Sequence, residues 1–334
     1  FGGDEFVILT EDLGDEDDAS VLAARIHDVL ADPIHVNGHT LHVTASTGVV
    51  PIDGELARDE LLSNADTAMY AAKDAGRATW TVFDAELRRR ASDRLRIEAE
   101  LRHALATSSG LSVHLQPEVA LAGRTTVGFE ALVRWTLPDG TNVPPDRFLP
   151  IAGDAGLMPM VGRHVVGSVA HALRTLRDNG SSMWIAVNAA AEELQHPDFA
   201  PQALRSLREV EVDASRLCIE ITEHSILKDP AGIDAALRPL RDLGATVAID
   251  DFGTGYSSLA YLTRFRPEYL KIDKSFTGAL LERSGDRAVV EAVLHLADSL
   301  SIVTVAEGIE TAEQADLLAD LGCQLGQGWH FGRP

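Results

Sequence analysis

Single polar residues recur near the end of successive apolar runs in the later two-thirds of this sequence. In chain order they are Glu130, Asn188, Glu220, Asp250, Asp251, Lys271, Glu307 and Gln327. One acid in such a place means little in a chain with 51 acidic residues. Five apolar runs in succession with this placement indicate one shared site.

The residue types indicate a metal site. Carboxylates that converge in a partly buried place repel one another and raise their own pKa values, and a divalent cation removes that cost. The candidate ligands are oxygen donors without clustered His or Cys, which favours Mg²⁺ or Mn²⁺ over zinc. The adjacent pair Asp250-Asp251 suits two neighbouring ions, as in two-metal phosphoester hydrolysis. Taken alone, the same pair fits a strand end followed by a solvated turn.

A glycine-containing segment, DDFGTGYSSL, begins with these two acids. It matches neither the GxGxxG nor the Walker pattern, so by itself it predicts only a tight loop. Because its first two residues are candidate metal ligands, we expect the rest of the segment to form a loop that helps to order the metal site.

Short apolar strands that alternate with helices must position these side chains. Eight strand candidates within roughly 225 residues predict an α/β fold, a (β/α)8 barrel, whose sites lie where the carboxyl ends of the strands meet. The strand candidates are 112–119, 126–135, 184–190, 217–223, 246–252, 269–273, 302–309 and 324–331, and the clearest helices are 161–178, 231–243 and 286–300.

These residues also carry a family resemblance. GFEALVRW, EITE, DDFGTGYSSL, LKID, VAEGIET and GQGWHFGRP occur in this order between about residues 93 and 334. Together they resemble the EAL family of cyclic di-GMP phosphodiesterases. The resemblance implies a modified TIM (β/α)8 barrel that hydrolyses cyclic di-GMP to linear pGpG with Mg²⁺ or Mn²⁺.

The resemblance also implies a role for each matching residue. One ion would be held by Glu130, Asn188, Glu220 and Asp250. Asp250, Asp251 and Glu307 would surround a second ion and the attacking water. Glu307, Lys271 and Asp251 would be catalytic, Gln116, Leu132, Arg134 and Gln327 would bind substrate, and Glu223 would anchor the DDFGTGYSSL loop. The alternative for Glu223 is a solvated residue after a strand.

Three departures from the family pattern bear on affinity and loop packing. HLQPEV replaces the usual Tyr-Gln-Pro-Ile, VNAAAEEL lacks the usual Leu-Ser after Asn188, and Gly153 stands where relatives commonly carry glutamate. Gly153 and the altered strand around Asn188 leave open the alternative of a catalytically weak cyclic di-GMP receptor. A second alternative, which depends on the sequence before Phe1, is a fragment of a bifunctional cyclase and phosphodiesterase.

The first 84 residues resemble a different family. FGGDEFVIL and ADTAMYAAKDAGR resemble the GGDEF family of diguanylate cyclases, and cover the later half of that α+β domain. The resemblance makes Gly2, Gly3, Asp4 and Glu5 the motif hairpin, with Asp4 a metal ligand, and Lys73 a triphosphate contact. The earlier half would precede Phe1, so we expect this segment alone not to perform cyclase chemistry.

The local pattern of that segment predicts four elements. We expect a strand at 6–10, a helix at 18–31, a hairpin whose turn is Asn37-Gly38, and a helix closed by Gly76. In the first helix the apolar stripe is Val21, Ile26, Val29 and Leu30. The charged segment 85–106, free of Gly and Pro, predicts a helical linker between domain 1–84 and domain 93–334.

The composition of the chain limits the classes of partner that we expect it to bind. The formal net charge is −22, and residues 1–84 hold 17 acidic and 4 basic residues, which disfavours nucleic acid as a partner. The absence of a run of eighteen apolar residues predicts no membrane segment. Cys218 and Cys323 lie in apolar stretches, which favours core thiols in a reducing compartment, the cytoplasm. The expected partner is cyclic di-GMP, and a homodimer through the EAL domain is left open.

Overall fold

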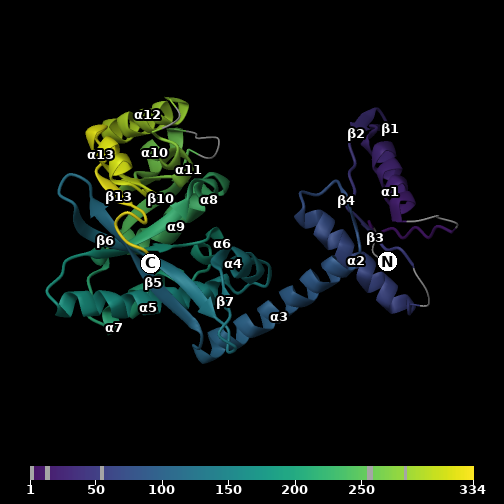
Figure 1. Cartoon of the computed structure of the whole chain (residues 1–334), viewed down its shortest axis with the longest axis horizontal. Coiled ribbons are helices and arrows are strands. Elements are labelled where there is room, and N and C mark those ends of the chain that lie inside the picture. Colours follow the sequence, from purple (N-terminus) through teal and green to yellow (C-terminus); the bar gives the residue numbers. More distant parts are fainter. Residues whose placement is uncertain (1–3, 12–15, 53–55, 254–258, 282–283) are drawn as a thin grey trace. The chain divides into compact units, whose positions relative to one another are not determined.

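A computed structural model describes residues 4–11, 16–52, 56–253, 259–281 and 284–334 (Figure 1). The chain divides into two compact units, Phe1–Ile97 and Glu98–Pro334. Each unit has its own secondary structure, and the two are described separately.

The first unit combines helices with two small sheets. The helices are α1 (Glu16–Ala31), α2 (Arg58–Asp74) and the start of α3 (Ala85–Thr107). Strands β1 (Ile34–Val36) and β2 (His39–Leu41) form an antiparallel hairpin, and β3 (Thr47–Val49) pairs in parallel with β4 (Trp80–Val82). The positive φ angles of Asn37 and Gly38 confirm the predicted two-residue turn.

Two predictions for this unit are wrong. Residues 6–10 form no strand, and Phe6 is 87% exposed, because no described strand lies beside this segment to pair with it. In α1, Val21 and Val29 are exposed, the latter by 73%. The helix instead buries Ala19 and Ala23, and His27 on it contacts the hydroxyl of Thr47 (Nε2 to Oγ1, 3.0 Å).

The second unit is a closed barrel, as predicted. Among the described residues, its sheet runs in the order β5, β13, β12, β11, β10, β9, β8, β6, with β7 added beside β6, and β5 also pairs with β6 to close the ring. The strands are β5 (Leu111–Ala120), β6 (Thr125–Thr136), β7 (Asn142–Val143), β8 (Trp184–Asn188), β9 (Leu217–Thr222), β10 (Thr246–Phe252), β11 (Tyr269–Ile272), β12 (Val303–Ala306) and β13 (Leu325–Gln327).

The barrel departs from eight parallel strands at β5. This strand runs antiparallel to both of its neighbours, β6 and β13. Only residues 121–124 join β5 to β6, and a connection that short produces a hairpin, since parallel neighbours need a crossover of a dozen residues or more. The expected modified barrel is thus modified at this strand.

Helices cover the outside of the barrel (Figure 1). Those in its first half are α4 (Pro145–Asp154), α5 (Met158–Asp178), α6 (Ala191–Leu194), α7 (Phe199–Glu209) and a 3₁₀ turn, Ala214–Arg216. Those in its second half are α8 (Glu223–Lys228), α9 (Pro230–Arg241), α10 (Leu259–Phe265), α11 (Lys274–Gly278), α12 (Ser284–Leu300) and α13 (Ala312–Asp320). They confirm the three predicted barrel helices, and α3 confirms a helix over 85–106.

Small residues and a pair of aromatic rings fill part of the barrel interior. Ala186, Cys218 and Ala248 form a buried cluster against which Trp184 and Tyr269 pack. Cys218 and Cys323 are free and buried, as expected for core thiols.

Within the described ranges, none of the helices combines the length and the apolar composition that a bilayer crossing requires.

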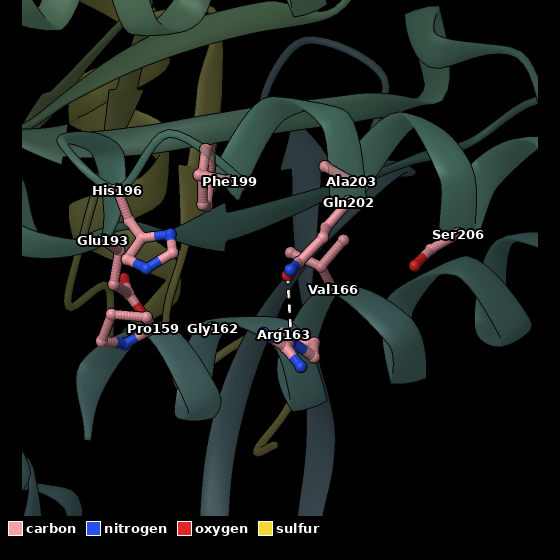
Figure 2. Close-up of a pocket in the computed structure, with 10 residues that line it drawn as sticks. All are labelled: Pro159, Gly162, Arg163, Val166, Glu193, His196, Phe199, Gln202, Ala203 and Ser206. Atoms are coloured by element: carbon pink, nitrogen blue, oxygen red, sulfur yellow. Dashed lines mark hydrogen bonds between the residues drawn. The ribbon is translucent and has the colours of Figure 1, made fainter.

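A buried carboxylate lies in a small pocket between α5 and α7 (Figure 2). Glu193 is 3% exposed, and its Oε2 accepts a hydrogen bond from the backbone N–H of Ala190 (2.7 Å). Burial raises the pKa of Glu193 to about 7, with a further contribution from Glu192. Hydrogen bonds from the backbone of Ala190 and Gly162 oppose that rise only in part. The folded chain therefore holds this proton at a pH where the unfolded chain has lost it.

This carboxylate predicts a pH dependence of stability. Because its folded pKa lies above the unfolded value, the free energy of unfolding should fall by up to about 3 kcal/mol as pH rises from about 4.5 to 7. Glu193→Gln should remove most of that fall, and the exposed-site control Glu209→Gln should keep it. Urea unfolding of the three proteins at pH 5 and pH 8 measures the difference. Equal pH dependence in all three would contradict the assignment.

Candidate active site

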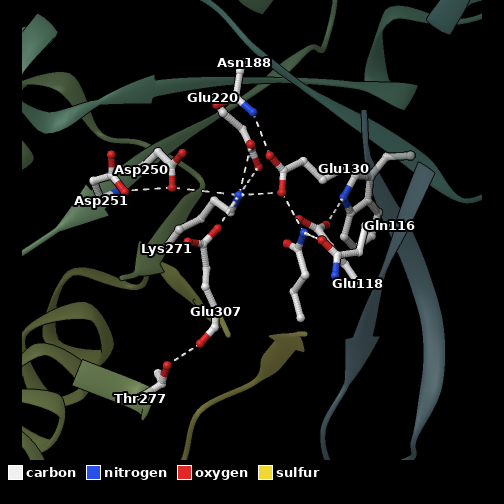
Figure 3. Close-up of polar contacts among 12 residues, drawn as sticks. Gln116, Glu118, Glu130, Asn188, Glu220, Asp250, Asp251, Lys271, Thr277 and Glu307 are labelled. Carbon is white, nitrogen blue, oxygen red and sulfur yellow. Dashed lines mark hydrogen bonds and ion pairs between the residues drawn. The ribbon is translucent and has the colours of Figure 1, made fainter. Parts of the chain in front are cut away.

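Lys271, from β11, lies at the centre of a ring of carboxylates inside the barrel (Figure 3). Its side chain is completely buried. The Nζ atom lies 3.0 Å from Glu220 Oε1 and 2.7 Å from Glu307 Oε1. It also lies 3.3 Å from Glu130 Oε2 and 3.8 Å from Asp250 Oδ1. Strands β6, β9, β10 and the end of β12 thus deliver four acids to one ammonium group.

Amide side chains hold Glu130 on its other sides. Asn188 Nδ2 donates to Glu130 Oε1 (2.6 Å), and Gln327 Nε2 donates to Glu130 Oε2 (2.6 Å). Gln327 Nε2 also lies 3.0 Å from Gln116 Oε1, and Gln116 Nε2 donates to the carbonyl of Gly332 (3.1 Å). The strand register explains this grouping, because Gln116 on β5 lies opposite Glu130 on β6.

Asp250, Asp251 and Glu307 form a second group at the edge of the ring. One ligand atom from each lies within 4.8 Å of the others. Consecutive residues in a regular strand point to opposite faces. Here the pairing of β10 with β11 shifts register between Ile249 and Phe252, and Asp251 has a φ of 55°. This bulge brings both aspartates to one group.

Burial and neighbouring charges shift the pKa values of Lys271, Glu220 and Glu307. Burial opposes ionisation of Lys271, yet Glu130, Glu220 and Glu307 raise its pKa well above the ordinary value. Burial raises the pKa of Glu220 well above its usual range and that of Glu307 to about 8, although Lys271 acts against both shifts. One ammonium group therefore does not offset the cost of burying Glu220 and Glu307 as anions.

Glu130 and Asp251 differ from those two acids in their surroundings. Burial acts against ionisation of Glu130, but Lys271 and the hydrogen bond from Gln327 hold its pKa below the ordinary value. Burial and the neighbouring charge of Asp250 raise the pKa of Asp251. Glu130 thus favours the ionised form, whereas burial and the charge of Asp250 disfavour ionisation of Asp251.

The residues present fit a divalent cation. The group contains carboxylate and amide oxygens without His or Cys, the ligands that Mg²⁺ and Mn²⁺ prefer. A cation would also favour the ionised forms of Glu220 and Glu307, whose pKa values are raised mainly by burial. The convergence of four carboxylates on one ammonium group, two of them with raised pKa values, makes this place suited to a metal.

Other predicted residues lie outside the ring. Leu132 is half-buried on β6 opposite His114, and Arg134 is half-buried with Nη1 donating to the carbonyl of Val133 (2.9 Å). Glu223 is buried at the start of α8, and its Oε2 accepts from the N–H of Gly253 (3.3 Å). The alternative that Glu223 is solvated is therefore wrong. The following loop residues, 254–258, lie outside the described ranges.

The candidate residues of the first unit are not part of this ring. Asp4, Glu5 and Lys73 are exposed in that unit. Gly2 and Gly3 lie outside the described residues.

Three buried residues of this region are absent from the sequence-based set. Glu118 accepts from Trp184 Nε1 (2.9 Å), and burial raises its pKa. Period-two alternation along β5 places Glu118 on the face of Gln116, so the pattern carried a signal for it. Thr277 and Gln314 contact the backbone around Glu307, and no sequence pattern marks them.

Comparison with known proteins gives two family matches and several relatives. The family model described as EAL domain matches residues 98–334, and that described as diguanylate cyclase, GGDEF domain, matches residues 1–79. The bifunctional diguanylate cyclase/cyclic di-GMP phosphodiesterase MucR of Pseudomonas aeruginosa is 37% identical over 336 residues, which cover 100% of this chain and 49% of MucR. The cyclic di-GMP phosphodiesterase NbdA of the same organism is 37% identical, with 100% and 43% covered. The chain thus spans about half the length of these relatives, or less.

Solved structures resemble the second unit. A PaMucR phosphodiesterase in a c-di-GMP complex has a TM-score of 0.68 and 36% identity, and the match covers 72% of this chain and 97% of that one. A Klebsiella pneumoniae BlrP1 complex with manganese and cyclic di-GMP has a TM-score of 0.60 and 30% identity, covering 68% and 56%. Both matches agree with the closed barrel described above.

Proposed function

The chain belongs to the EAL domain family, and on this basis we propose that it hydrolyses cyclic di-GMP to linear pGpG in second-messenger signalling. The observation that carries the proposal is the ring of acids around Lys271. It lies in a barrel that is 36% identical to a phosphodiesterase solved in complex with c-di-GMP.

We propose that the ring holds Mg²⁺ or Mn²⁺. Glu130, Asn188, Glu220 and Asp250 would hold one ion, and Asp250, Asp251 and Glu307 a second. When bound, the ions would supply positive charge for the scissile phosphate and for the attacking water. The raised pKa values of Glu220 and Glu307 support this assignment, because a bound cation would offset the burial that disfavours their ionised forms.

The chain's own side chains would then manage protons and orientation. Glu307, whose Oε1 lies 2.7 Å from Lys271 Nζ, is placed to orient the attacking water and accept its proton. Lys271 would hold that carboxylate in position and stabilise charge on the phosphate oxygens. Asp251, exposed at the mouth of the barrel, would complete the surroundings of the water.

Substrate contacts would come from neighbouring strands β5, β6 and β13. Arg134 can grip a phosphate through its guanidinium, and Leu132 offers an apolar surface beside it. Gln116 and Gln327 hold Glu130 and each other through their amides. We propose that they contact the ligand while keeping Glu130 oriented.

One incubation tests this function. The purified chain is mixed with cyclic di-GMP and either Mg²⁺ or Mn²⁺, and the products are separated by chromatography. Formation of pGpG, abolished by EDTA and restored by the metal, is the expected result. Binding of cyclic di-GMP without any pGpG would overturn the proposal in favour of a receptor.

Glu223 is proposed to anchor the loop that follows the two aspartates. Its carboxylate is buried, and its Oε1 has no hydrogen-bond partner among the described residues. Glu223→Gln weakens a charge-assisted contact to Gly253, so we expect turnover about tenfold lower and a higher Mg²⁺ requirement. Turnover measured against Mg²⁺ concentration, with Glu209→Gln as the control, checks this. Superimposable curves for parent and Glu223→Gln would refute the anchor.

The same proposal extends to the rest of the chain. We propose that α3, which begins in the first unit and ends in the second, is a linker between a GGDEF-like segment and the barrel. The buried free thiols Cys218 and Cys323 suit the reducing cytoplasm. Light scattering of the purified chain tests the homodimer left open by the sequence.

A further inference from the structure

Glu307 lies where the sheet no longer fixes the backbone. It directly follows β12, and residues 307–310 have no regular secondary structure. Its N–H still donates to the carbonyl of Ile272 (3.1 Å). Its carbonyl group therefore needs another partner to hold the peptide, and with it the carboxylate, in place.

Thr277 on α11 supplies that partner. Its side chain is completely buried, and its hydroxyl donates to the carbonyl of Glu307 (Figure 3). The hydroxyl also lies 3.2 Å from the carbonyl of Lys274. A hydroxyl carries one proton, so one of these two carbonyls depends on it at any moment.

Gln314 ties the same segment to α11 from the other side. Its buried Oε1 accepts from the N–H of Glu310 (2.8 Å) and the N–H of Thr311 (3.0 Å). Its Nε2 lies 3.3 Å from the carbonyl of Thr277 and 3.4 Å from that of Gly278. One amide thus satisfies backbone groups on both sides of the contact.

The contact between the two segments is also tight. Gly308 has a φ of 67°, and a Cβ atom there would lie 2.5 Å from Lys274 Cβ. A side chain at this position would therefore push the segment away from α11. Close packing and hydrogen bonds together join residues 307–311 to α11.

We propose that Thr277 and Gln314 are positioning residues that hold Glu307 through its backbone. Thr277 sets the Glu307 peptide, and Gln314 prevents the segment after it from moving. The carboxylate then stays within reach of Lys271 Nζ and of the ligand atoms of Asp250 and Asp251. The inference rests on the proposed function for its effect on turnover, but not for its effect on metal binding.

The test compares Thr277→Val, which keeps the shape and removes the hydroxyl, with Thr277→Ser, which keeps the hydroxyl. Binding of Mn²⁺ without substrate is measured by electron paramagnetic resonance, and kcat and KM with cyclic di-GMP are measured separately. Thr277→Val should weaken Mn²⁺ binding and lower kcat, each by about 10-fold or more, with KM little changed. Thr277→Ser should restore both. Thr175→Val, at an exposed helical threonine, is the matched control.

The other possible results of these experiments also bear on the inference. Folded Thr277→Val with parental Mn²⁺ binding and kcat overturns it. If Thr277→Val does not fold, Thr277→Ala is compared with Thr277→Ser, and failure of both Val and Ala variants to fold shows that the hydroxyl serves the fold alone. A parent that binds Mn²⁺ without hydrolysing cyclic di-GMP refutes the proposed function but leaves the Mn²⁺ comparison decisive. A parent that does neither overturns both.

Discussion

Glu130→Ala is expected to abolish hydrolysis of cyclic di-GMP, with kcat lowered by about 1,000-fold or more, or about 4 kcal/mol of transition-state stabilisation. Glu130 accepts hydrogen bonds from Asn188 and Gln327, and it lies 3.3 Å from Lys271 Nζ. The substitution removes the acid of the ring whose pKa is held low, which is the acid best suited to remain a charged ligand. It also frees both amides to reorient.

Turnover and Mn²⁺ binding by parent and variant check this result. Glu291→Ala, on the exposed face of α12, is the control and should behave as the parent does. Turnover of Glu130→Ala within about threefold of the parent would exclude Glu130 from the metal site, since loss of metal-supported chemistry costs several kcal/mol.

Lys271→Met is expected to destabilise the fold as well as stop the chemistry. It removes the ammonium group that lies against Glu130, Glu220, Asp250 and Glu307. Removing one partner of a buried ion pair typically costs about 3–5 kcal/mol, because the other charges stay buried without compensation. We expect a loss of that size in the free energy of unfolding at pH 8.

The sign of its pH dependence follows from the same charges. Without Lys271 the buried acids have folded pKa values above their unfolded ones, so the folded state binds more protons and gains stability as pH falls. Added Mn²⁺ should restore part of the lost stability, because its positive charge would compensate the buried acids in place of the ammonium group. Urea unfolding at pH 6 and 8, with and without Mn²⁺, measures both effects, and Lys228→Met at an exposed site is the control. Equal stability of Lys271→Met and parent at pH 8 would show that the acids are already neutral.

The sequence predicted the barrel well because its strands are buried and apolar on both sides. The apolar runs 217–223 and 246–252 form strands β9 and β10 with almost the predicted bounds. Their acids lie close together, as expected for neighbouring parallel strands. A one-dimensional pattern was sufficient here because each of these polar residues interrupts or follows an otherwise apolar, buried strand. The roles of the individual residues remain predictions that the variants above test.

The pattern failed where the outcome depends on neighbours in space. Val21 and Val29 have helical spacing, yet spacing does not say what covers them. The alternation rule would separate Asp250 from Asp251, and only the bulge in β10 unites them. In the sequence, Lys271 is one polar position among several. Its place at the centre of the acids depends on the other strands and loops that converge on it, which the sequence pattern does not show. Thr277 acts on a backbone carbonyl, a contact that any hydroxyl residue could make.

The reversed strand β5 has a consequence for biosynthesis. Its pairing with β13 closes the ring, and the hydrogen bond between Gln116 and Gln327 joins residues 211 positions apart. A chain that leaves the ribosome amino end first makes the β5–β6 hairpin early and β13 nearly 200 residues later. Until then one edge of β5 keeps its backbone groups unpaired, which is a template for pairing with other chains. We therefore expect the yield of native protein to depend on how soon β13 pairs with β5.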